Sequence, residues 1–137
     1  MNYNTHTLPN GIRIIHAPNR SAVAYCGFAI DAGTRDEDAG EQGMAHFVEH
    51  LLFKGTKKRH AWHILNRMEH VGGDLNAYTN KEETVVYSAF LVEHFPRAVE
   101  LLADIVFHST FPQAEIDKEV EVIIDEIQSY EDSPSEL

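Results

Sequence analysis

The chain has 137 residues and a formal net charge of −11, from 22 acidic and 11 basic side chains. This length suits one domain with a core and is too short for two ordinary domains, so we expect residues 1–137 to lie within one domain. The acidic balance argues against nucleic acid as a partner, and no apolar run approaches the roughly 18 residues that a membrane span requires.

The first residues predict a β-hairpin, because the extended runs YNTHTL and IRIIHA flank the turn signal PNG. A third strand is expected over 22–32. It contains Cys26, the only cysteine of the chain, so an internal disulfide is excluded. We expect Cys26 to be a small buried residue rather than a reactive thiol. The acidic, glycine-containing stretch GTRDEDAGEQG then predicts a loop.

Helical periodicity dominates the rest of the chain. The predicted helices span 41–53, 61–71, 93–108 and a last segment from Pro112 to about Tyr130, and the strands predicted between the second and third helices span 74–79 and 83–90. The expected apolar stripes are Trp62, Leu65 and Met68 in the second helix, and Phe95, Ala98, Leu102 and Ile105 in the third. This order of elements indicates an α+β fold with a largely antiparallel sheet packed against helices.

The helix expected over 41–53 has an unusual polar face. At about 100° per residue, His46, Glu49 and His50 share one sector with Phe53, opposite a broad apolar face. A surface helix would normally carry lysines and glutamates there, so we expect this face to be enclosed. His46 and His50 lie one turn apart and can place two nitrogens on one zinc ion, with Glu49 beside it as a base. The alternative is a hydrogen-bonded pair of core histidines beside a salt-bridging glutamate.

A third zinc ligand is expected from the acidic last helix, because a catalytic zinc usually has three protein ligands. Two of its acids, Glu119 and Glu126, lie two turns apart on one ridge within the apolar sector, where an unpaired carboxylate is costly. Spacing alone leaves both candidates open. The apolar sector itself contains Ile116, Val120, Ile123, Ile124, Ile127 and Tyr130.

Four blocks of the sequence resemble the M16 metallopeptidases, or inverzincins: HFVEH, LLFKGT, GGDLNAYTNKEETVVYSA and EVEVIIDEIQSYEDSP. This family includes insulin-degrading enzymes and the mitochondrial and bacterial processing peptidases. The blocks follow the order and spacing of the family along essentially the whole chain. Because family domains are longer than this chain, the resemblance implies the N-terminal part of one metal-bearing domain, truncated from a longer peptidase.

The resemblance also implies a site. The family's third ligand lies 76 residues after the second histidine, a position that Glu126 occupies here. His46, His50 and Glu126 would then hold one zinc ion, and Glu49 would be the general base. Glu119 matches a glutamate that supports the site without binding the metal.

The function implied is that of a zinc-dependent endopeptidase acting on a peptide or an unfolded polypeptide. Asn76 and Ala77, in the family's edge strand, would accept the extended substrate by strand addition. A second M16-type half or a homologous subunit would be the protein partner.

Three alternatives remain at this point: a metal-binding but non-catalytic homologue or partner subunit, a metal-binding module with no peptidase role, and a plain helical interaction domain. We expect neither nucleic acid nor a membrane as a partner. The polar first residues lack the layout of a secretory signal, so we expect a cytoplasmic protein.

Overall fold

The computed structural model describes residues 2–132. Its elements in chain order are β1 (Asn4–Thr7), β2 (Arg13–His16), β3 (Val23–Ile30), η1 (Thr34–Asp36), α1 (Met44–Leu51), α2 (Ala61–Glu69), β4 (Asn76–Thr79), β5 (Thr84–Leu91), η2 (Val92–His94), α3 (Phe95–His108) and α4 (Gln113–Asp132). The expected α+β class with antiparallel pairing is confirmed. No helix within the described range combines the length and apolarity that crossing a membrane requires.

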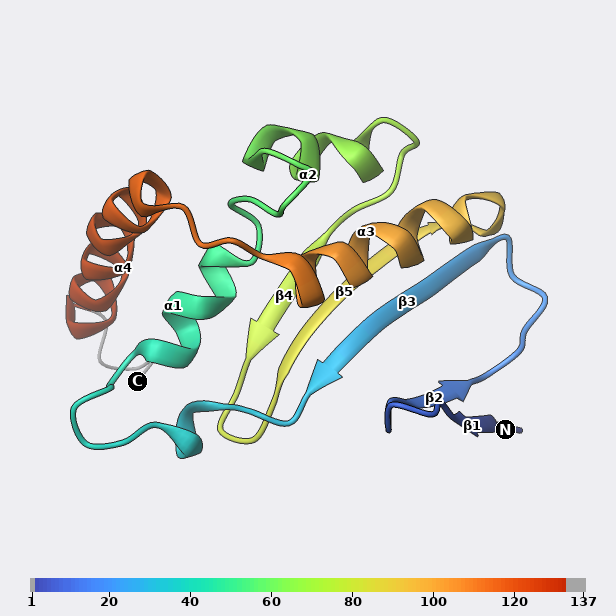
Figure 1. Ribbon diagram of the computed structural model, residues 1–137, viewed down its shortest axis with the longest axis horizontal. Helices are drawn as coiled ribbons and strands as arrows, with labels where there is room; N and C mark the ends of the chain where they lie inside the picture. Colours follow the sequence, from blue (N-terminus) through green and yellow to red (C-terminus); the bar gives the residue numbers. More distant parts are fainter. Residues whose placement is uncertain (1, 133–137) are drawn as a thin grey trace.

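The central sheet has three antiparallel strands in the order β3–β5–β4. Its middle strand, β5, buries Val86, Ser88 and Phe90 at alternate positions. In Figure 1, α3 crosses one face of this sheet, and α1 and α4 lie side by side beyond β4. The strands β1 and β2 pair with each other as a separate hairpin on the far side of β3. The β4 edge therefore faces the two helices that carry the predicted site.

The core lies between the sheet and the helices α2 and α3. Ala98, Leu102 and Ile105 of α3 are buried as predicted, whereas Phe95 at the start of this helix is exposed. The remaining core residues are Leu52, Ile64, Met68, Val86, Phe90 and Leu101. Cys26 is half-buried and packs against this core, and burial raises the pKa of its thiol, as expected for a packing residue.

The apolar stripe predicted for α2 is wrong in part. Trp62 and Leu65 are exposed, and α2 instead buries Ile64 together with Met68, one turn further along. The helix has only nine residues, and its main helical neighbour is α3. Packing therefore buries only one edge of the apolar sector and leaves the other edge exposed. Wheel geometry defines the sector but not the edge that reaches the core.

The helix α1 begins three residues later than predicted. Gly43 precedes it with a φ of 86°, a left-handed conformation that favours glycine and stops the helix from extending backwards. The Glu37 carboxylate then accepts a hydrogen bond of 2.9 Å from the backbone N–H of Met44. This contact satisfies one of the free donors at the start of α1.

The loop that follows α1 is anchored to α3 by a polar cluster of Thr56, Lys58, Arg59, Glu100 and Asp104. Arg59 donates at 2.7 Å to Asp104 and forms two bonds, of 2.8 and 2.7 Å, with Glu100. Lys58 also donates to Glu100 at 2.7 Å, and the Thr56 hydroxyl donates to Asp104 at 2.7 Å. Burial acts to raise the pKa of Glu100, but the hydrogen bonds and charges of Arg59 and Lys58 outweigh it and lower this pKa to about 2.

The apolar sector predicted for the last helix is only partly buried. Ile123 is buried on α4, but Val120 and Ile124 are exposed. The buried edge of α4 contains Glu119 and Ile123 and lies against α1. The side chains of Ile127 and Tyr130, also assigned to this sector, lie outside the described part of the structure.

Candidate metal centre

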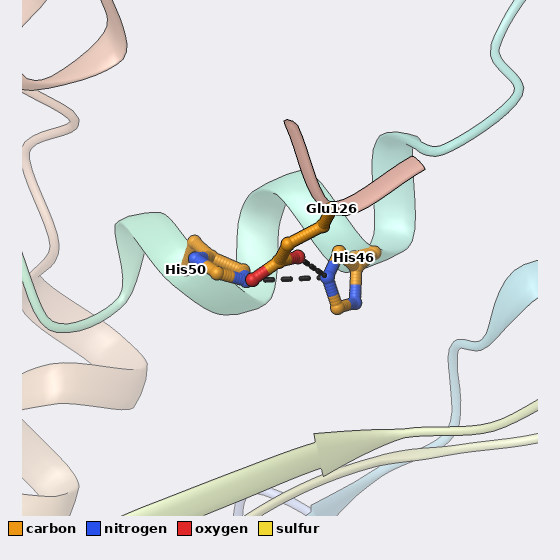
Figure 2. A group of neighbouring side chains, drawn as sticks. All are labelled: His46, His50 and Glu126. Atoms are coloured by element: carbon orange, nitrogen blue, oxygen red, sulfur yellow. Dashed lines mark hydrogen bonds and ion pairs between the residues drawn. The ribbon is translucent and has the colours of Figure 1, made fainter. Parts of the chain in front are cut away.

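Three side chains predicted as zinc ligands meet between α1 and α4. His46 and His50 project from successive turns of α1, and Glu126 reaches them from α4 (Figure 2). His46 Nε2 lies 2.8 Å from Glu126 Oε2 and 3.2 Å from His50 Nε2. His50 Nε2 lies 3.5 Å from the same carboxylate oxygen. These atoms form a compact triangle built from two helices that are far apart in the sequence.

This triangle fits the geometry of zinc. Ligand atoms at 2.0–2.1 Å from a tetrahedral zinc ion lie about 3.3 Å from one another. The three distances here run from 2.8 to 3.5 Å and bracket that value. Two imidazoles and one carboxylate are also the donor set of several catalytic zinc sites, in which a fourth position stays open. The residues present therefore suit a zinc ion.

Glu119 lies behind the triangle and not at it. Its Oε2 is 3.0 Å from His50 Nδ1, the ring nitrogen that faces away from the meeting point. Its other oxygen, Oε1, is 3.1 Å from the Lys54 ammonium. The carboxylate is buried, with a side-chain exposure of 6%. Of the two candidates for the third ligand, Glu126 is therefore the one whose carboxylate oxygen meets the Nε2 atoms of both histidines, whereas Glu119 contacts only Nδ1 of His50 among these ring nitrogens.

Glu49 is close to the triangle without being part of it. Its Oε2 lies 3.7 Å from His46 Nδ1, beyond hydrogen-bond distance, and accepts a bond of 2.6 Å from the Thr79 hydroxyl. Thr79 is not among the site residues predicted from the sequence. Thr79 lies 30 residues from Glu49 in the sequence, so spacing along the chain does not predict the contact. The strand position does give a signal, because Thr79 follows Ala77 by two residues and shares its face of β4.

The predicted enclosure of the polar face of α1 is wrong in part. The His46 side chain is 40% exposed, whereas His50 and Glu49 are 22% and 14% exposed. The far end of α1 is covered, since Leu51 is buried, but the first turn opens to solvent, where Met44 is 46% exposed. The triangle is therefore accessible from outside.

A hollow of about 310 Å³ adjoins the triangle on the side of β4. Glu49 and His50 line one wall and Asn76 and Ala77 the other. Apolar side chains that contribute to its lining are Phe53, Leu65 and Leu75. Within the described range β4 pairs only with β5, so its other edge is open next to this hollow. The structure thus brings Asn76 and Ala77 to the same space as Glu49.

The chain is similar to known peptidases. The family model for insulinase (peptidase family M16) matches residues 13–137. The mitochondrial-processing peptidase subunit beta of Bos taurus is 44% identical over 130 residues, which cover 95% of this chain and 26% of that protein. A protein of Rickettsia bellii described as an uncharacterized zinc protease is 43% identical over 138 residues, covering 99% of this chain and 33% of that protein.

A solved structure has the same fold. The crystal structure of a protease from Helicobacter pylori superposes with a TM-score of 0.88 at 27% sequence identity, over 91% of this chain and 30% of that one. The chain thus spans about a quarter to a third of the length of the relatives it matches. The family model covers nearly all of the sequence, and the chain belongs to the insulinase family of peptidases, family M16.

Proposed function

We propose that this chain carries the zinc-binding site of a metalloendopeptidase and is the N-terminal part of one M16 domain. The observation that carries the proposal is the triangle of His46, His50 and Glu126, whose spacing suits one zinc ion. When bound, zinc supplies a Lewis acid for the scissile carbonyl and lowers the pKa of a coordinated water. His46, His50 and Glu126 would hold the ion through two neutral imidazoles and one carboxylate.

Glu49 is the general base of this proposal. The Thr79 hydroxyl holds its Oε2, which leaves Oε1 to take a proton from the attacking water. The same oxygen then returns the proton to the leaving amine. Glu49 is suited to this role because it lies one turn after His46 and directly before His50, but outside the triangle of ligand atoms.

The substrate class is an extended peptide or an unfolded polypeptide. A substrate strand can pair with the open edge of β4 through backbone hydrogen bonds, which give affinity with little sequence preference. Asn76 and Ala77 lie where such a strand would pass Glu49, and the hollow beside them can receive one substrate side chain. The protein partner in this proposal is a second M16-type half or a homologous subunit.

The test is Glu49→Gln in the complete protein. Glutamine keeps the size of the side chain but cannot take a proton, so we expect peptide hydrolysis to fall by about 100- to 10,000-fold. Zinc content should remain at one ion per site. Turnover would be followed with a fluorogenic peptide, and zinc by elemental analysis of the same preparation.

The matched control is Glu41→Gln, which removes an exposed acid ahead of α1. We expect this variant to hydrolyse peptides at the wild-type rate. Normal hydrolysis by Glu49→Gln would overturn the assignment of the base. Stoichiometric zinc with no hydrolysis by the wild-type complete protein would instead favour a metal-binding module with no peptidase role.

A further inference from the structure

Lys54 makes a contact that the proposed mechanism does not use. It lies three residues after the end of α1, and its Nζ is 3.1 Å from Oε1 of Glu119 on α4. The second oxygen of the same carboxylate is 3.0 Å from His50 Nδ1. The side chains are 27% exposed for Lys54 and 6% for Glu119. A partly covered cation, a buried anion and a proposed zinc ligand therefore form one chain of contacts.

The backbone next to Lys54 is held on both sides. The N–H of Lys54 donates to the carbonyl of Leu51 at 3.1 Å, and the carbonyl of Gly55 accepts from the N–H of Thr110 at 3.1 Å. Gly55 also forms an isolated bridge with His60. The segment after α3 thus fixes the point from which the Lys54 side chain extends toward α4.

The contact with Glu119 determines which nitrogen of His50 carries the proton. An ionised carboxylate only accepts hydrogen bonds, so His50 Nδ1 must be the donor to Glu119. A neutral imidazole then keeps its lone pair on Nε2, the atom that faces His46 and Glu126. Such outer contacts fix the ring and tautomer of metal-binding histidines.

We propose that Lys54 is a positioning residue for the zinc ligand His50, acting through Glu119. By holding one oxygen of the buried carboxylate, Lys54 keeps the other oxygen directed at His50 Nδ1. An uncharged side chain at this position would leave Glu119 buried without its cation, a costly state that favours a turn of the carboxylate toward solvent. This inference rests on the proposed zinc site.

The neighbouring lysines have other surroundings. Lys58 pairs with Glu100 in the cluster that anchors the loop, and Lys57 is exposed. Lys57→Met therefore removes the same charge, three residues away, without touching the chain of contacts. It is the matched control for Lys54→Met.

The first experiment measures zinc affinity in the complete protein by competition with a chromophoric chelator. We expect Lys54→Met to weaken binding about tenfold, the lower end of the range for outer contacts of metal ligands. Lys57→Met should bind as the wild type does, and Lys54→Arg should recover most of the loss because it keeps the charge. Lys54→Met combined with Glu119→Gln should be no weaker than Glu119→Gln alone, since Lys54 acts through that carboxylate.

The second experiment reads the tautomer of His50 in the metal-free protein by ¹⁵N NMR, with the signal assigned from a His50→Gln variant. We expect the proton on Nδ1 in the wild type and a mixture of tautomers in Lys54→Met. Should the Met variant fail to fold, Lys54→Leu serves as the second uncharged variant.

If the folded Lys54→Met or Lys54→Leu variant has the zinc affinity and the His50 tautomer of the wild type, the inference is overturned. Failure of the wild type to bind zinc would overturn the proposed function instead. The tautomer measurement still decides the role of Lys54 in that case, because it needs no metal.

Discussion

Two polar clusters of this chain differ in how their charges are arranged. In the cluster between the loop after α1 and α3, Arg59 and Lys58 meet Glu100 and Asp104 at 2.7 Å, so opposite charges pair directly. Between α1 and α4, two ring nitrogens and a carboxylate oxygen converge on each other instead. Each of these three atoms can offer a lone pair to a cation.

This difference suits the loop–α3 cluster to a structural role and the α1–α4 triangle to the proposed zinc site. The loop–α3 cluster pairs opposite charges directly and fastens one segment to another. The α1–α4 triangle gathers three atoms with lone pairs at one point, where a shared proton or a bound cation can join them. We therefore expect changes in the first cluster to alter stability and changes in the second to alter zinc binding.

The largest expected effect is the loss of zinc from the triangle. Glu126→Gln and His46→Phe should each weaken zinc binding by more than about 100-fold, because loss of a ligand exceeds the 10–100-fold loss for its supporting contacts. Chelator competition measures this loss. Asp125→Asn, an exposed acid next to Glu126, is the control and should bind like the wild type. Equal affinities for Glu126→Gln and Asp125→Asn would remove Glu126 from the ligand set.

The next effect is on stability. Arg59→Met leaves Asp104 buried without its cation, and breaking a buried pair in this way costs about 3 kcal/mol or more of unfolding free energy. Urea denaturation of the complete protein would measure it. The folded variant should still bind one zinc ion per site. A variant as stable as the wild type would show that the loop–α3 cluster does not anchor the loop.

A smaller effect is the pH dependence of that cluster. The pKa of Glu100 falls from its ordinary value of 4.5 to about 2 in the folded chain, so the unfolded chain binds more protons between these values. Its contribution to stability is complete above about pH 4.5 and is lost as the pH falls toward 2. Glu100→Gln should therefore flatten the stability curve in this window. An unchanged slope in denaturation curves taken across it would contradict the lowered pKa.

The smallest effect belongs to a surface pair outside both clusters. Arg35 and Glu82 lie 3.2 Å apart with side chains 62% and 71% exposed, so water screens their attraction. Arg35→Gln should change the unfolding free energy by no more than about 1 kcal/mol and leave zinc affinity unchanged. A larger loss in thermal denaturation would mean that this pair supports the loop before α1.

Much of the site could be predicted because it depends on the period of a helix. His46, Glu49 and His50 lie within five residues of one another, so one helical turn and a half decides their common direction. The helical period likewise places Glu119 and Glu126 on one ridge of the last helix, which left these two acids as candidates for the third ligand. The family resemblance then favoured Glu126, and the structure places its carboxylate at the histidines.

The contacts that periodicity could not predict are those between distant segments. Thr79 reaches Glu49 from another element, and Arg59 reaches Asp104 across 45 residues. Likewise, the exposure of Leu65 and Val120 depends on which edge of each helix meets a neighbour. A single sequence specifies which face is apolar, but packing decides how much of that face is covered.

X-ray absorption at the zinc edge would show whether His46, His50 and Glu126 bind one zinc ion together. For the zinc-loaded complete protein we predict one ion per site with two imidazole nitrogens and carboxylate or water oxygens at about 2.0–2.1 Å. In Glu126→Gln, the zinc still bound at high concentration should keep both imidazoles but change its oxygen ligands. A spectrum without two imidazoles, or one that Glu126→Gln leaves unchanged, would contradict a shared zinc site of these three residues.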